Sequence, residues 1–518
     1  MIVQTFEDAF CPEWIQTHLA NPTHDLIILR HIIPWQPIIE RLVPFYNPHK
    51  GRPGHSLRLL VATSILARLR QLSDRKVIEA MQENRYMQYF CHVPDHRLMT
   101  FVNPSTLCRW RQRLGTEGTL IVEDQVFTHL KRAAVIDADM MLMDTTVVES
   151  PIMSPTDVRL LYKAFDNMAA LATDAKLDLW WDQPHIKQRW RAYNLHQKDR
   201  LVYLGEFHTL FVPAFASFAA HLDHLPESPL RQRWSHLLEV LNLLNAQTQQ
   251  KLAGESHIAH RLVSLDDLDA RPIKKGKSHP STEFGTTLQM TFNRQGFMIT
   301  TDNFIGQPND TTLYGPTLEH FRERMHTYPG TAVTDLGFRS AKNLKRNAHE
   351  IAQVFMGRSA DVDEAQQEAC RKARAATEGF IAVANHLRGF GRSLYRGLHG
   401  ATLWTRLSQC AYNLKKFLQL YRTEALEEST LIKLRLSSSR RLAHSRQCIG
   451  LQRETAPGPL PATRAPSHGG NRTGLTDVDA DALTNLVRPP DFLPYLSYGS
   501  PYDFSIQGKI SGYYLTRP

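Results

Sequence analysis

Short apolar segments alternate with helical segments over residues 140–390, and their order limits the folds that the chain can adopt. The first apolar segment, MMLMDTTVV at residues 140–148, has the composition of a buried strand. TTLQMTF and GFMITT, separated by Asn293-Arg294-Gln295, predict a hairpin. The next expected elements are the helix TLEHFRERMHTYPG, the strand TAVTD, the helix SAKNLKRNAHE, the strand IAQVFM and a long helix over residues 363–387. Together they predict an α/β domain.

Residues 157–270 interrupt this alternation with helical periodicity alone. Without them, the order strand, hairpin, helix, strand, helix, strand, helix is that of an RNase H-like core, so we expect a helical insertion packed beside that core. The ends of the insertion must lie close together, because the first strand and TTLQMTF should be neighbours in one sheet. Four indole rings in the insertion either fill a small helical core or stack on an unpaired base: Trp180, Trp181, Trp190 and Trp234.

The first ~125 residues are expected to form an all-α domain. A helix begins at Leu57, and Ser73 is expected to cap a second helix, DRKVIEAMQENRYMQYF. Ser105 or Thr106 then caps a short helix that ends at Gly115 and carries three arginines, Arg109, Arg111 and Arg113. This arrangement is typical of a helix-turn-helix that reads the major groove of DNA. The alternative is a small helical bundle with a solvated basic face.

Composition and charge favour an intracellular protein with an anionic partner. The net charge of +10 and the pI near 9.2 point to nucleic acid as the commonest such partner. The six cysteines form no CxxC pair, which indicates reduced thiols in a cytoplasm. The start of the chain lacks the pattern of a signal peptide, and we expect no membrane span, since no apolar run approaches ~18 residues. At 518 residues, two to four structural units are expected.

Three carboxylates hold the positions that phosphodiester chemistry requires in an RNase H-like core. Asp144 ends MMLMD on the first strand, Asp335 ends TAVTD, and Glu378 lies in the long helix. Phosphoryl transfer uses two divalent cations bound by carboxylate oxygens, so three acidic groups must meet on rigid elements. Taken singly, each residue is more simply a cap or a solvated side chain. Asp137 and Asp139 are rivals at the far end of the strand, and Asp302 and Asp310 are expected in loops.

The motifs around these carboxylates resemble the ISNCY-like branch of bacterial insertion-sequence transposases, with an N-terminal segment similar to the InsH-type domain. The resemblance covers roughly residues 50–420. It rests on Asp144-Thr145-Thr146-Val147-Val148-Glu149, Pro155-Thr156-Asp157, Leu160-Leu161, Arg271-Pro272-Ile273, Thr282-Glu283-Phe284-Gly285, Asp335-x-Gly337-Phe338 with Asn343, Glu378-Gly379-x-Ile381, Tyr395-Arg396-Gly397-Leu398 and Ala411-Tyr412-Asn413-Leu414.

The resemblance implies a DDE-type transposase that cleaves transposon ends and joins them to target DNA. It implies a triad of Asp144, Asp335 and Glu378 holding two Mg²⁺ ions, which Mn²⁺ can replace. A homodimer on DNA at the nucleoid is expected, with neither a membrane nor a small-molecule substrate. Further DNA contacts are expected from the basic loop before the hairpin and from the last helix: Lys274, Lys275, Lys277, Arg374 and Arg388.

The expected domains are a helical DNA-binding domain over residues 1–125, a catalytic domain over 126–425 and a disordered tail over 426–518, rich in Ser, Arg, Pro and Gly. Two other functions stay open. One is a decayed copy that only binds DNA, since Arg371 and Asn385 stand where related transposases carry Tyr and Lys. The other is an RNase H-like nuclease that cleaves without joining strands.

Overall fold

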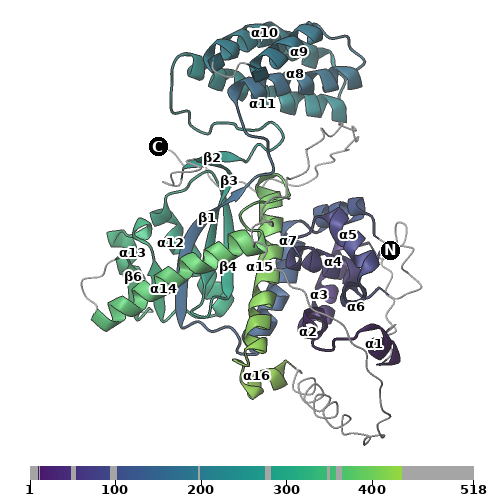
Figure 1. Cartoon of the computed structure of the whole chain (residues 1–518). Helices are drawn as coiled ribbons and strands as arrows, with labels where there is room; N and C mark the ends of the chain where they lie inside the picture. Colours follow the sequence, from purple (N-terminus) through teal and green to yellow (C-terminus); the bar gives the residue numbers. More distant parts are fainter. Residues whose placement is uncertain are drawn as a thin grey trace, which may run out of the picture.

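The computed structural model describes residues 10, 12–47, 54–93, 102–195, 199–274, 282–346, 351–357 and 364–434. A sheet lies beside a group of N-terminal helices, and a second group of helices projects from one end of that sheet (Figure 1). From residue 435 onward, the tail lies outside the described residues, as do Lys275 and Lys277. The first part of the expected tail forms the short helix α16 (Glu428–Lys433).

The N-terminal region is helical, as expected. Its elements are α1 (Pro12–His18), α2 (Asp25–Ile32), α3 (Trp35–Leu42), η1 (Val43–Phe45), α4 (Leu57–Leu69), α5 (Asp74–Glu83), α6 (Arg85–Cys91) and α7 (Pro104–Arg132). Ser73 caps α5 by accepting a hydrogen bond from the backbone N–H of Lys76, which confirms the predicted cap. The helix predicted beyond it is divided at Asn84, whose extended backbone ends α5 and whose side chain caps α6.

Helix α7 corrects the expected short basic helix. Its N-cap is Asn103, with Pro104 in the first turn, so the prediction of Ser105 or Thr106 was wrong. Gly115 adopts φ 58° and ψ −162°, a conformation that glycine alone adopts readily, and the helical axis kinks there. A second helical segment then continues to Arg132, beyond the expected domain boundary at residue 125.

The described part of the sheet has six strands: β1 (Met140–Glu149), β2 (Arg271–Lys274), β3 (Thr282–Phe292), β4 (Met298–Ile305), β5 (Thr331–Thr334) and β6 (Gln353–Met356). β3 is antiparallel to β1, β2 and β4, whereas β1, β5 and β6 are parallel. All the strands expected from the sequence are present. β2 was missed, because a four-residue segment with Pro and Lys has the composition of a loop.

Helices cover both faces of the sheet. They are α12 (Asp310–Met325), the turn η5 (Leu336–Phe338), α13 (Ala341–Lys345), α14 (Glu364–Ala382), the π-helical turn η6 (Val383–Leu387) and α15 (Gly397–Arg422). α14 crosses one face, with Leu142 and Val333 beneath it in a shared apolar cluster. The other face packs into the largest apolar core, which contains Ile299 of β4, Phe321 of α12 and Phe127 of α7. The N-terminal helices therefore share one core with the sheet.

The insertion is a bundle with a core of its own. It contains α8 (Asp157–Asp174), α9 (Gln183–Leu195), α10 (Arg200–His221), η4 (Leu222–His224) and α11 (Pro229–Leu252). Trp234 is fully buried and stacks on Phe218 at 4.2 Å between ring centroids. The bundle projects from the sheet and is not packed along it, unlike the expectation (Figure 1). Residues Arg200–His224 also form a stretch long and apolar enough to cross a membrane, a feature that the sequence analysis did not expect.

The close pairing of the two strands that flank the insertion confirms that its ends lie near each other. Val148 lies opposite Thr286, and Glu149 lies opposite Gly285. The chain leaves the sheet at the end of β1 and returns through β2, which pairs with the beginning of β3. The insertion is therefore attached at one corner of the sheet.

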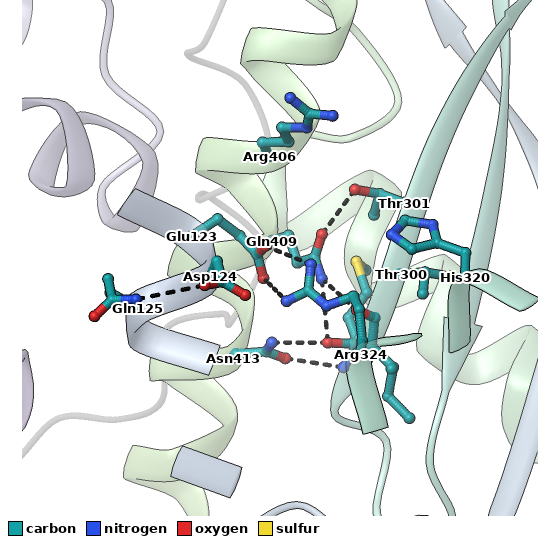
Figure 2. Close-up of polar contacts among 12 residues, drawn as sticks. Glu123, Asp124, Gln125, Thr300, Thr301, His320, Arg324, Arg406, Gln409 and Asn413 are labelled. Atoms are coloured by element: carbon teal, nitrogen blue, oxygen red, sulfur yellow. Dashed lines mark hydrogen bonds and ion pairs between the residues drawn. The ribbon is translucent and has the colours of Figure 1, made fainter. Parts of the chain in front are cut away.

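A buried polar network joins the N-terminal helices to the sheet (Figure 2). Arg324 of α12 donates two hydrogen bonds to Glu123 of α7, at 2.6 and 2.8 Å, and the side chain of Glu123 is 1% exposed. Asn413 of α15 accepts from the Met298 N–H of β4 and donates to its carbonyl, at 2.9 and 2.8 Å. Gln409, one turn earlier, donates to the carbonyl of Ile299. These contacts fix α15 between the sheet and the N-terminal helices.

Candidate functional site

Asp144 and Asp335 lie at the same level on neighbouring parallel strands. The last pair in the register of β1 and β5 is Leu142 with Val333, and each aspartate follows its member of that pair by two residues. Neighbouring strands are about 4.8 Å apart, and side chains alternate between faces with a period of two. Since Leu142 and Val333 both face α14, the two aspartates start from adjacent chains on that same face.

The chain turns sharply after Asp335. The Asp335 carboxylate caps η5 by accepting a hydrogen bond from the Gly337 N–H at 2.9 Å. A Cβ at Gly337 would lie 3.0 Å from Oδ2 of Asp310 and 3.1 Å from Oδ1 of Asp335. Both carboxylates therefore lie beside Gly337. Asp310, expected in a loop, is in fact the first residue of α12.

Glu378 lies on α14, the helix that packs against β1 and β5. Its neighbour Thr377 is buried, whereas the Glu378 side chain is 64% exposed and forms an ion pair with Arg374 at 3.4 Å. Among the described residues, no group of three or more His, Cys, Asp or Glu side chains is gathered closely enough to hold a metal ion. Asp144 in the middle of β1 and Asp335 at the end of β5 thus lie on adjacent strands, while Glu378 forms an ion pair with Arg374 on its own helix.

A hollow of about 460 Å³ opens beside the second half of β1, between the sheet and the N-terminal helices. It is lined by Thr146, Val147 and Glu149 of β1, by Asn385, His386, Arg388, Gly389, Gly391, Arg392 and Leu394 after α14, and by Arg68, Gln71, Glu283 and Trp404. Asn385 donates a hydrogen bond to the Thr146 hydroxyl at 2.9 Å, two residues after Asp144. The π-helical turn is therefore fastened to the strand of the first aspartate.

The three arginines predicted on α7 have different surroundings. Arg111 is buried, forms a bidentate pair with Asp74 at 3.0 and 2.5 Å, and lies 4.3 Å from the centre of the Tyr395 ring. Arg109 and Arg113 are exposed, and Arg113 lies over the ring of Tyr46 at 4.7 Å. Arg111 thus joins α5 to α7, while the other two remain available to a ligand.

The other predicted basic residues that the structure describes lie on separate surfaces. Lys274 ends the edge strand β2 and is exposed. Arg374 pairs with Glu378, and Arg388 follows η6. Burial lowers the pKa of Arg388, although its charge lies near the Tyr412 phenol, which acts in the opposite direction. Arg68 of α4 and Gln71, just after α4, also line the hollow beside β1. They were not predicted as site residues, because they lie far from the other lining residues in the sequence.

Comparisons with known proteins agree with a mobile-element origin. Residues 15–113 match the family model described as Transposase domain (DUF772). The chain is 32% identical over 176 residues to a protein of Rhizobium meliloti named "Uncharacterized protein ORF8 in nfe locus", a match that covers 33% of this chain and 84% of that protein. No solved structure matches. The chain therefore belongs to the family of the ORF8 protein of the nfe locus, and its N-terminal region carries a match to a transposase domain.

Proposed function

We propose that the chain is a DDE-type transposase that cleaves the ends of an insertion sequence and transfers them to target DNA. The observation that carries the proposal is the register of β1 with β5, which starts Asp144 from the middle of β1 and Asp335 from the end of the adjacent strand β5, both beneath α14, the helix of Glu378. An antiparallel part, β4-β3-β1, beside a parallel part, β1-β5-β6, agrees with an RNase H-like core. The transposase-domain match supports the same activity independently.

The donor set suits a hard divalent cation. Asp144, Asp335 and Glu378 offer only carboxylate oxygens, the ligands that Mg²⁺ prefers, and Mn²⁺ accepts the same ligands. Asp144 and Asp335 would hold two ions, and Glu378 would hold one of them after leaving Arg374. Bound there, the ions would stabilise charge on the entering and leaving oxygens of phosphoryl transfer.

The residues around the carboxylates would position DNA for two successive reactions. Hydrolysis of a phosphodiester bond at the transposon end frees a 3′ hydroxyl, which then attacks a phosphodiester of the target. Thr146 and Asn385 hold the turn after α14 against β1, so the strand of Asp144 and the helix of Glu378 keep a fixed relation. Arg374, released by Glu378, would become available to a DNA phosphate.

The N-terminal helices would supply recognition of the ends in a helix-turn-helix-like manner. Arg109 and Arg113 are the exposed members of the predicted set, while Arg111 would support them from its pair with Asp74. A homodimer on DNA in the cytoplasm, at the nucleoid, completes the proposal. A DNA-binding protein without cleavage is the second candidate, favoured by the ion pair that holds Glu378 away from an assembled metal site.

A nicking assay tests the proposal. The purified full chain is incubated with Mg²⁺ and a supercoiled plasmid that carries the DNA flanking its gene. We expect nicked plasmid with the wild type and a loss of at least about a hundredfold with Asp144→Asn or Asp335→Asn, since each removes a carboxylate ligand. Asp139→Asn, directly before β1, is the matched control. Equal nicking by Asp144→Asn and the wild type would contradict the assignment.

Measurements of DNA binding and of strand joining separate the proposed function from the other candidates. If the wild type binds the flanking DNA but never nicks it with Mg²⁺ or Mn²⁺, the second candidate holds. If it nicks but does not join a free 3′ end to a second plasmid, the chain is a nuclease without strand transfer.

A further inference from the structure

A second hollow, of about 750 Å³, lies between α14, α15 and the beginning of α2. Four basic side chains line it, namely Arg388, Lys415, Lys416 and Arg422, and we call it the basic groove. Its α14 wall is built from small and apolar residues, among them Ala376, Gly379 and Phe380. We propose that the basic groove binds the phosphodiester backbone of the DNA strand that leads to the cleavage site.

The charges of the basic groove are unbalanced. Asp25 is the one carboxylate in its lining, and it pairs with Lys415 at 3.6 Å and with Arg422 at 2.6 Å. Lys416 and Arg388 have no carboxylate partner among the described residues. The Lys416 amine lies 5.6 Å from the centre of the Phe380 ring, and Arg388 donates to the carbonyl of Leu387. Two cations thus remain for an external anion.

Partial burial makes these cations receptive to an anion. Burial is the main cause that lowers the pKa of Lys415, Lys416 and Arg388. A cation that has lost part of its hydration gains more from an ionised oxygen than a fully solvated one, because the local dielectric constant is lower. A phosphate provides such oxygens to lysine and arginine alike.

The position of the basic groove matches the proposed chemistry, on which this inference rests. Gly379 in its wall directly follows Glu378, and a Cβ at Gly379 would meet no atom within 4 Å, so the wall is open there. Arg388 lines both the basic groove and the hollow beside β1. A DNA strand that lies in the basic groove would pass Arg388 and reach β1, the β-strand that carries Asp144.

The experiment measures DNA binding without any divalent metal, so that it does not depend on catalysis. Full-length Lys416→Gln and the double variant Lys416→Gln/Arg388→Gln are titrated against a labelled random-sequence single strand of 30 nucleotides at several KCl concentrations. Each lost phosphate contact should lower the slope of log K against log salt by ~0.7. We expect roughly fivefold weaker binding from the single variant and about twenty-fivefold from the double variant, as each charge-assisted contact contributes on the order of 1 kcal/mol.

Lys372→Gln is the matched control, because Lys372 lies on α14 outside the lining of the basic groove, is 76% exposed and pairs with Glu368. A second comparison uses Gly379→Glu and Gly379→Gln, which add side chains of equal size to the open wall. The glutamate should weaken binding more, because it places a negative charge next to the phosphates. Circular dichroism and the melting temperature establish that each variant is folded.

Two results would overturn the inference. One is that Lys416→Gln and Lys372→Gln have the same affinity and salt slope; the other is that Gly379→Glu and Gly379→Gln bind alike. An acidic peptide that displaces the DNA, together with variants that leave the salt slope of DNA binding unchanged, would also count against the inference. Failure of the proposed function would give a different result. If the chain never nicks DNA but the groove variants still bind DNA more weakly, the inference about the basic groove holds and the proposed transposase activity does not.

Discussion

The N-terminal helices and the insertion are both all-α regions attached to one sheet, but they are attached in different ways. Phe127 of the N-terminal helix α7 lies in the same core as Ile299 of the sheet, and the buried pair of Glu123 with Arg324 crosses the junction. The insertion has a separate core built around Phe207, Phe211 and Trp234. The first region is therefore a structural part of the body that contains the sheet, whereas the second has the organisation of an independent domain.

The largest expected effect comes from removing the centre of the insertion. Trp234→Ala deletes a fully buried indole and its hydrogen bond to the Phe218 carbonyl, and should destabilise the bundle by about 3–5 kcal/mol. Hydrogen exchange read by mass spectrometry should show faster exchange over residues 157–252 alone. Faster exchange in α4 and α15 as well would show that the two cores are coupled, against the comparison.

A change at the other junction should give the opposite pattern. Glu123→Ala leaves Arg324 buried without its partner, which should lower the free energy of unfolding of the shared body by about 3–5 kcal/mol. The control is Asp124→Ala, which removes a half-exposed pair with Arg41 and should cost less than about 1 kcal/mol. The measurement is urea unfolding, with exchange over the insertion unaffected. Similar midpoints for the two variants would contradict the structural role of Glu123.

Trp190 offers a smaller effect that tests what the insertion does. Its ring stacks on Tyr162 at 4.7 Å and is partly buried, so Trp190→Ala should cost about 1–2 kcal/mol within the bundle. If the ring also stacks on an unpaired base, the variant should cleave a pre-opened DNA end at the wild-type rate and a fully paired end more slowly. Equal rates on the two substrates would leave only the packing role.

Deleting the insertion should have the smallest effect on the rest of the molecule. Replacing residues 157–265 with a short Gly-Ser linker retains the pairing of β1 with β3, since Glu149 and Gly285 are already opposite each other. Loop closure depends weakly on length, so the remaining body should keep its free energy of unfolding to within about 1 kcal/mol. Calorimetry of the shortened chain checks this. A body that no longer folds would show that the insertion is a structural part of it.

The same contrast explains what could be predicted from the sequence. Periodicity in the insertion and apolar composition in β1 and β5 are local signals, and the elements that they predicted are present. The role of Arg111 could not be predicted, because its partner Asp74 lies 37 residues away and an arginine on a helix usually faces solvent. The positions of Asp144 and Asp335 on adjacent strands depend on the strand order in the sheet, which we predicted from the order of strands and helices along the sequence. The i, i+4 spacing of Arg374 and Glu378 on one helix allows their ion pair, but it does not specify whether Glu378 keeps this pair or turns toward a metal ion.

The hydrogen bonds of α15 with the outer strand β4 also limit how copies of this protein can associate. Exposed backbone groups at a sheet edge recruit strands from other molecules, which leads to aggregation. At the start of β4, the Met298 N–H and the carbonyls of Met298 and Ile299 are already occupied by the amides of Asn413 and Gln409. Strand addition from a second molecule is therefore blocked at these two residues, and copies of this chain cannot pair edge to edge at the start of β4.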